Sequence, residues 1–153
     1  MRIHMTLVVG VSAAAALMAA SPQAAQSDTR VIVEFQRAAD SYAFAHRQAD
    51  RRGARGDAVE GALFTPQVAS ALRSQIANGV KRSGCLIKAQ GDDSVLRVNG
   101  PIDGTLPVSP CLAAVLPKLP EELEYRTADR SLILADAHLH IIVDILHAAL
   151  PQE

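Results

Sequence analysis

The sequence of 153 residues contains no tryptophan, and aromatic residues make up only 3% of it. Surfaces that stack nucleobases or sugar rings depend on such side chains, so we expect no platform of that kind. An excess of charge of one sign is also lacking, because the formal net charge is −1 at pH 7. A chain with this balance has no general electrostatic attraction to nucleic acids or to anionic membranes.

Recognisable catalytic and cofactor motifs are also missing from the sequence. It contains no Gly-x-Ser-x-Gly nucleophile elbow, no phosphate-binding glycine-rich loop and no His-Glu-x-x-His zinc motif. Its two cysteines are too far apart for a Cys-x-x-Cys redox pair. We therefore expect a protein that is not an enzyme and that carries no cofactor.

The first 25 residues have the pattern expected of a leader. Arg2 and His4 form a short basic start, an apolar run follows over residues 5–20, and small residues dominate 21–25. This is the order of a secretory signal peptide, and a membrane-spanning helix would need about 20 strongly apolar residues. We expect residues 1–25 to be a cleaved signal peptide, with a cut a few residues earlier as an alternative. Residues 26–153 then form a single small globular domain, periplasmic or secreted, with no integral membrane segment.

Cys85 and Cys111 both belong to the expected mature chain. In an oxidising compartment an even number of cysteines favours a disulfide. In the chain-entropy model a loop of this size contributes roughly 3 kcal/mol to stability. The alternative is a pair of buried, unpaired thiols, because cysteine is among the most buried residue types.

Apolar residues at helical spacing predict two main helices. The first covers residues 28–51, and its apolar face consists of Val31, Phe35, Ala38, Tyr42, Ala45 and Ala49. The second begins at Thr65, a favourable N-cap, with Pro66 in its first turn. Gly84 follows it and can supply a left-handed C-terminal cap.

A cluster of basic side chains lies near the end of the first predicted helix. Its members are His46, Arg47, Arg51, Arg52 and Arg55. Positive charge suits the C-terminal end of a helix dipole. We therefore interpret the cluster as a solvated helix terminus and not as a binding patch.

The pattern changes to that of strands after Cys85. Residues 86–87 and 95–98 are short strand candidates, and 123–127 with 131–135 indicate an antiparallel hairpin. Residues 138–145 alternate again. A helix is the alternative for that last stretch, but its β-branched side chains favour a strand.

Between these segments, residues 101–120 are rich in proline and leucine. We interpret them as an ordered cover across the domain, with a short helix over 111–116. The helical period before Gly84 and the strand period after it predict an α+β fold. Two main helices are expected to pack on a small antiparallel C-terminal sheet.

The sharpest chemical candidate in the sequence is Asp136-x-His138-x-His140, followed by Asp144. Alternate side chains share one face of a strand, so these four groups would line up on the outward face. Two imidazoles and a carboxylate are suitable ligands for Zn²⁺, Ni²⁺ or Cu²⁺. The alternative is an ordinary solvated strand face.

Several C-terminal segments carry a resemblance: Leu-Pro-Glu-Glu-Leu-Glu-Tyr-Arg at 119–126, Arg-Ser-Leu-Ile-Leu at 130–134, Asp136, Ile-Val-Asp at 142–144 and Ala-Leu-Pro at 149–151. Together they resemble the C-terminus of uncharacterised exported bacterial proteins, in which a Leu-Pro lead precedes a hairpin and a final Ile-Val-Asp strand. Phe-Thr-Pro at 64–66 is similar to the same group. The resemblance implies kinship and export, and it brings no catalytic residue with it.

Two functions from different classes follow from the sequence. The first is a non-catalytic binding or structural protein of the cell envelope, whose partner is an unknown envelope protein. The second is a small periplasmic protein that binds or senses a transition metal through His138 and His140, with Asp136 or Asp144 completing the site.

Overall fold

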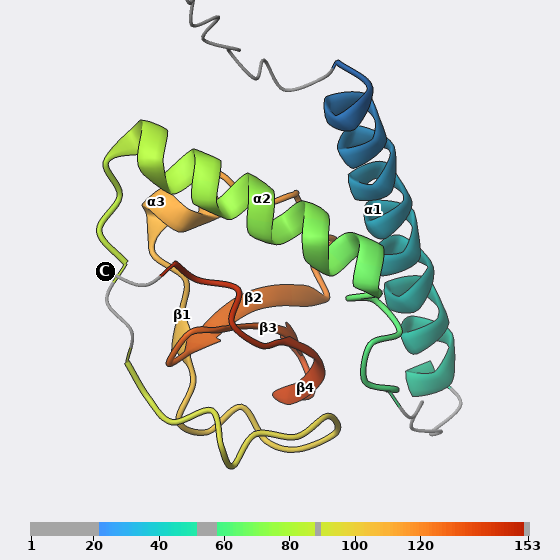
Figure 1. Cartoon of the computed structure of the whole chain (residues 1–153). Helices are drawn as coiled ribbons and strands as arrows, with labels where there is room; N and C mark the ends of the chain where they lie inside the picture. Colours follow the sequence, from blue (N-terminus) through green and yellow to red (C-terminus); the bar gives the residue numbers. More distant parts are fainter. Residues whose placement is uncertain (1–21, 52–57, 88–89, 152–153) are drawn as a thin grey trace, which may run out of the picture.

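The computed structural model describes residues 22–51, 58–87 and 90–151, and it has the expected α+β architecture (Figure 1). Its elements in chain order are α1 (Pro22–Arg51), α2 (Pro66–Ser83), β1 (Leu106–Pro107), α3 (Pro110–Ala113), β2 (Leu123–Ala128), β3 (Ser131–Asp136) and β4 (Ile141–Leu146). The signal peptide predicted for residues 1–25 falls outside this description, apart from 22–25 at the start of α1.

The helix α1 begins at Pro22, six residues before the predicted start. Proline is well suited to the first turn of a helix, because its missing N–H has no partner there in any case. The buried face of α1 follows helical spacing through Phe35, Ala39, Ala43 and His46. This face sets α1 against α2 and against one end of the sheet, as Figure 1 shows.

The helix α2 has the ends that its sequence predicts. Thr65 is its N-cap, and the Thr65 hydroxyl accepts a hydrogen bond from the backbone N–H of Val68. Pro66 is the first helical residue. At the other end Gly84 is left-handed, with φ 64°, and its N–H donates to the carbonyl of Val80.

The four strands form one antiparallel sheet in the order β1-β2-β3-β4. The strands β2 and β3 make the predicted hairpin, in which Leu123 pairs with Asp136 and Ala128 with Ser131. The helices cover one face of the sheet (Figure 1). Side chains from residues 96–102 pack on the opposite face, so the sheet is buried on both sides.

A β-bulge interrupts the pairing of β3 with β4. Leu134 pairs with Asp144, whereas Ala135 pairs with Ile142, so Val143 is an extra residue in β4. Val143 belongs to the core on the helix side, and Ile142 packs on the other side. The uninterrupted alternation that the sequence predicted over 138–145 is therefore wrong for this strand.

Three further predictions need correction. Residues 86–87 and 95–98 form no strand; in the latter segment Val95 and Val98 lie in turns, and one isolated bridge joins Gln90 to Asp129 nearby. The last strand begins at Ile141, because residues 137–140 make a tight turn after β3. The short helix α3 ends at Ala113, earlier than the predicted 116. Strand propensity alone did not decide these segments, since no neighbouring strand pairs along their length.

The segment around α3 is pinned to the end of α2. Cys85 and Cys111 form a disulfide, with their Cα atoms 6.0 Å apart. The segment that follows α3 also approaches α2 closely at Gly79, where an added Cβ would lie 2.5 Å from Cγ1 of Val115. Within the described part of the chain, no helix combines the length and hydropathy needed to cross a bilayer.

Candidate functional site

The turn between β3 and β4 is organised by Asp136. The Asp136 carboxylate accepts hydrogen bonds through Oδ1 from the backbone N–H of His138, at 2.8 Å, and of Leu139, at 2.7 Å. Local capping of this kind is a common use of aspartate in turns. The side chain is almost fully buried, so its position reflects the fold and not a solvated surface.

Asp144 is also buried, which contradicts the prediction that it faces solvent. Its carboxylate accepts hydrogen bonds from the backbone N–H groups of Gly61 at 2.8 Å, Leu63 at 2.9 Å and Phe64 at 2.7 Å. The bulge at Val143 turns Asp144 toward the helix side of the sheet, where the loop before α2 lies. Asp144 thus fixes the loop that leads into α2.

The four residues proposed as metal ligands are not gathered into one site. His138 and His140 are exposed on the tight turn, whereas Asp136 and Asp144 are buried and bound to backbone amides. The common strand face that would have aligned them does not exist, because residues 137–140 are a turn. Among the described residues no group of three or more His, Cys, Asp and Glu side chains could hold a metal ion.

A buried pair that the sequence pattern did not predict joins α1 to the sheet. His46 Nδ1 lies 2.9 Å from Oδ2 of Asp136, a distance at which a protonated imidazole forms an ion pair. The ring N–H is not aligned for a hydrogen bond, and this oxygen accepts none from the described residues. His46 was assigned to a solvated helix terminus, which is wrong. Its spacing of four residues from Tyr42, on the apolar face, was the signal that could have placed it inside.

Tyr42 extends this cluster along α1. Its ring stacks on the imidazole of His46, with centroids 5.5 Å apart and an interplanar angle of 11°. The Tyr42 hydroxyl is buried and has no hydrogen-bond partner in the described structure. Burial raises the pKa of Tyr42 to about 12, and the nearby carboxylate of Asp136 adds to that rise.

A partly exposed ion pair lies next to the buried His46–Asp136 pair. Arg47, next along α1, pairs with Glu122 in the segment before β2. The pKa of Glu122 lies below its usual value, first because the residue's own backbone N–H donates to the carboxylate and then because of Arg47 and His138. The cluster therefore ties α1 to the edge of the sheet. Arg51, Arg52 and Arg55, assigned to the same basic cluster, have side chains outside the described set.

A serine, a histidine and an aspartate also meet at the start of β3. The Ser131 hydroxyl donates to Oδ2 of Asp93 at 2.5 Å, and it lies 3.2 Å from Nδ1 of His147. In a catalytic triad the histidine bridges serine and aspartate through its two ring nitrogens. Here one nitrogen of His147, Nδ1, faces both Ser131 and Asp93, so the imidazole does not bridge them. Ser131 is also fully buried. This arrangement holds the 91–94 turn against the sheet.

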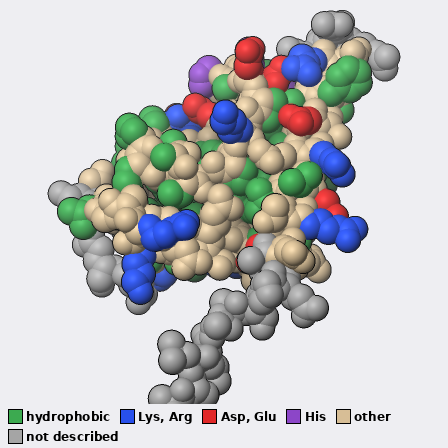
Figure 2. Space-filling view, turned by 90° about the horizontal axis from the view of Figure 1, so that it is seen from above, with side chains coloured by type: hydrophobic (Ala, Val, Ile, Leu, Met, Phe, Trp, Pro, Cys, Tyr) green, Lys and Arg blue, Asp and Glu red, His purple; other side chains and the backbone are tan. Residues whose placement is uncertain are grey.

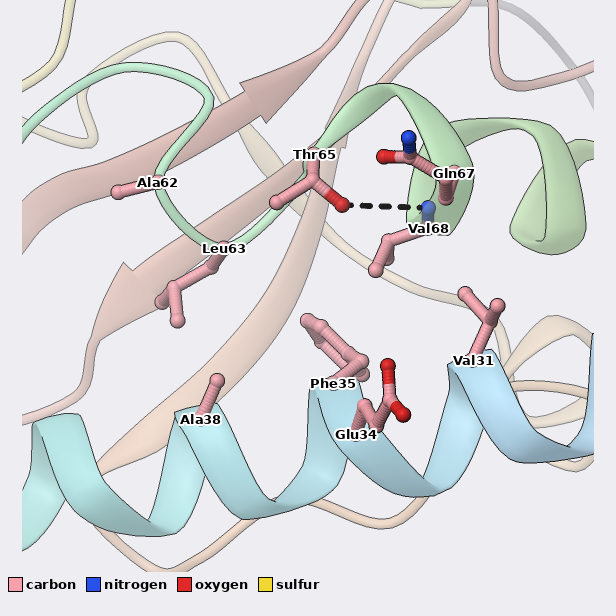
Figure 3. Close-up of a pocket in the computed structure, with 9 residues that line it drawn as sticks. All are labelled: Val31, Glu34, Phe35, Ala38, Ala62, Leu63, Thr65, Gln67 and Val68. Carbon is pink, nitrogen blue, oxygen red and sulfur yellow. Dashed lines mark hydrogen bonds between the residues drawn. The ribbon is translucent and has the colours of Figure 1, made fainter.

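An open cleft of about 280 Å³ lies where α1 passes the start of α2 (Figure 3). Most of its lining is apolar: Val31, Phe35, Ala38, Ala62, Leu63 and Val68. Phe35 points from α1 toward the start of α2, as Figure 3 shows; it is fully buried, and its ring stacks on Phe64, so it belongs to the floor of the cleft. Glu34, Thr65 and Gln67 are the polar residues around it.

Comparison with protein-family models, with curated proteins and with solved structures finds no match to this chain. Any account of its function therefore depends on its own residues.

Proposed function

We propose that the mature chain is an exported, non-catalytic protein that binds another protein of the cell envelope in the cleft between α1 and α2. The observation that carries this proposal is the composition of the cleft. Six of the nine residues around it are apolar, and the space is open to solvent. Pockets of this kind accept a large side chain of a partner, and such an anchor dominates many protein interfaces.

The occupant that fits best is an apolar side chain on an exposed segment of the partner. Burying one such side chain contributes roughly 1.5–3 kcal/mol, which makes a single anchor significant. Gln67 lies beside the apolar floor, so its amide is placed to bond the partner's backbone. The carboxylate of Glu34 also borders the cleft, but it already pairs with Arg30. The hydroxyl of Thr65 is less available, because it caps α2.

The polar clusters of the fold support a binding role over catalysis. Asp136 and Asp144 are occupied by backbone amides, and His46 is buried against Asp136. These groups hold the turn, the loop before α2 and the helix α1 in place. They are therefore used to fix the shape around the cleft.

Export is part of the proposal. It is supported by the signal-peptide pattern over residues 1–25 and by the disulfide between Cys85 and Cys111, since such bonds persist in oxidising compartments. Intact-mass measurement of the periplasmic or secreted fraction should give a mature N-terminus between residues 21 and 27 and no free thiol. A chain retaining residues 1–20 in a membrane pellet, or two free thiols, would contradict it.

The binding role is tested by photo-crosslinking in the native host. A photoreactive residue is placed at Val31 or Ala62, both at the cleft, and at the exposed control positions Lys81 and Asp103. We expect one adduct of defined mass from both cleft positions and none from the controls. The same adduct should disappear from position 62 when Val31→Asp places a charge in the cleft, with the fold checked by circular dichroism. Equal adducts from all four positions, or none from the cleft, would overturn the proposal.

A further inference from the structure

The helix α1 carries a second stripe on the side away from the core. Val33 is 40% exposed and Phe44 is 59% exposed, although both are large and apolar. Arg37 and Asp40 lie between them and are also exposed. All four positions recur at intervals of three or four residues, so they share one face of the helix.

The order of this outward stripe (Val33, Arg37, Asp40 and Phe44) is symmetric. Its spacings are four, three and four residues, so it reads the same in both directions about a point between residues 38 and 39. Two identical helices that run antiparallel about a two-fold axis at that point would bring position 33 opposite position 44, and 37 opposite 40. An interface of this kind uses the same surface patch on both copies.

We propose that the protein forms a homodimer through this outward stripe of α1, with the two helices antiparallel. Val33 of each copy packs against Phe44 of the second copy, and Arg37 forms an ion pair with Asp40 of the second copy. With a rise of about 1.5 Å per residue, the two apolar contacts lie roughly 16 Å apart, with the two ion pairs between them.

Charge complementarity favours this pairing over a parallel one. Within the described structure neither Arg37 nor Asp40 takes part in an ion pair, so both are available. In a parallel dimer each of them would face its own like charge, which is unfavourable. The antiparallel register does bring Arg30 near Arg47, but these residues are already paired within each copy.

Within each copy, Arg30 pairs with Glu34 and Arg47 pairs with Glu122, so the repulsion between Arg30 and Arg47 across the interface is offset.

Seen from above in Figure 2, charged side chains of both signs alternate with apolar ones on the right-hand side, where α1 lies in Figure 1. The cleft is on the inner side of α1, beside Phe35. The dimer is therefore independent of the binding role proposed for the cleft.

Sedimentation of the exported protein over about 1–500 µM tests the dimer directly, because the dimer fraction must rise with concentration. We expect Arg37→Asp and Asp40→Arg, each alone, to weaken dimerisation by about tenfold or more, since each places like charges across both symmetric contacts. The double variant with both changes restores opposite charges and should recover the wild-type association. Both substitutions lie at exposed positions, so circular dichroism should show an unchanged fold in all three variants.

Cysteine pairing tests the direction of the helices. Val33→Cys and Phe44→Cys proteins are oxidised separately and as a mixture. Disulfide-linked dimers should form only in the mixture, because each introduced thiol faces the other position. A wild-type chain that stays monomeric, single charge reversals that dimerise normally, or a Val33→Cys protein that links to itself as readily as the mixture would each overturn the proposal.

Discussion

His46 Nδ1, on α1, lies 2.9 Å from Oδ2 of Asp136, at the end of β3, and the two side chains are only 9% and 1% exposed. The pair connects residues that are 90 positions apart in the sequence. It is a buried contact between the long helix and the end of β3, and its removal should therefore be costly.

We expect His46→Leu to destabilise the fold by about 3 kcal/mol, because it removes the side-chain partner of a buried carboxylate, which then keeps only the amides of His138 and Leu139. In the Asp136→Asn background the same change should cost less, since no buried charge remains. The coupling energy from this double-mutant cycle, measured by urea unfolding, should be about 1–3 kcal/mol. An equal cost of His46→Leu in both backgrounds would show that the two side chains do not interact.

Asp144 gives a second prediction about stability. Asp144→Asn removes the charge and replaces one acceptor oxygen by an NH₂ group, while the three amides at Gly61, Leu63 and Phe64 remain. We expect a loss of about 2–4 kcal/mol in the free energy of unfolding, because buried donors lose their partners. Asp103→Asn, on an exposed turn, is the matched control and should change stability by less than about 0.5 kcal/mol. Equal effects of the two substitutions would contradict the assigned role.

The buried hydroxyl of Tyr42 should make the free energy of unfolding depend on pH in the alkaline range. Burial raises its pKa to about 12, against 10.0 for an ordinary tyrosine. The folded state therefore holds this proton more tightly than the unfolded chain, so stability is unaffected below pH 10 and falls as the pH rises from there toward 12. Tyr42→Phe should reduce the fall, measured as the free energy of unfolding from about pH 8 to about pH 11.

At neutral pH the same variant should be as stable as wild type, or more stable by about 1 kcal/mol, because the Tyr42 hydroxyl is buried without a partner. Part of the alkaline decline will persist, since burial also raises the pKa of Tyr125. If the free energy of unfolding falls with pH equally steeply in Tyr42→Phe and in wild type, Tyr42 does not contribute to the alkaline decline.

Gly79 provides a test of the contact between α2 and the segment that follows α3. In the middle of an exposed helix, Gly→Ala is stabilising by about 0.5–1 kcal/mol. Here the new methyl group would meet Val115 at 2.5 Å, so we expect Gly79→Ala to destabilise by about 1–3 kcal/mol. The cost should be smaller in a Val115→Ala background, which removes both Cγ methyl groups but keeps the Cβ that would lie 2.7 Å from the new methyl group. Thermal unfolding of the four proteins of this cycle decides between the two signs, and a stabilising Gly79→Ala in the wild-type background would contradict the close packing.

The histidines of the β3–β4 turn give a fifth prediction. His138 and His140 are exposed, and His140 is left-handed with φ 54°, so Asn is the suitable replacement there. We expect the variant His138→Ala, His140→Asn to keep its stability within about 0.5 kcal/mol. Calorimetric titration with Zn²⁺, Ni²⁺ and Cu²⁺ should give the same heats for the variant and wild type. Micromolar binding that only the wild type shows would support a metal-binding function.

The sequence determined the elements that depend on neighbouring residues. The ends of α2 follow from Thr65, Pro66 and Gly84, whose capping chemistry acts within one turn of the helix. The β2–β3 hairpin follows from alternation and from a turn of a few residues. The ends of α2 and the hairpin both depend on residues that are close in the sequence, so the sequence is sufficient to predict them. Together they led to the prediction of an α+β fold.

The tertiary structure alone decided the roles of the buried polar residues. Asp144 was predicted to face solvent, and only the bulge at Val143 brings it to amides some 80 residues earlier in the chain. His46 was predicted to be solvated, and only the docking of α1 places it against Asp136. A charged or polar side chain enters a protein interior when partners compensate for its lost hydration. Those partners are distant in sequence, so no local pattern could reveal them.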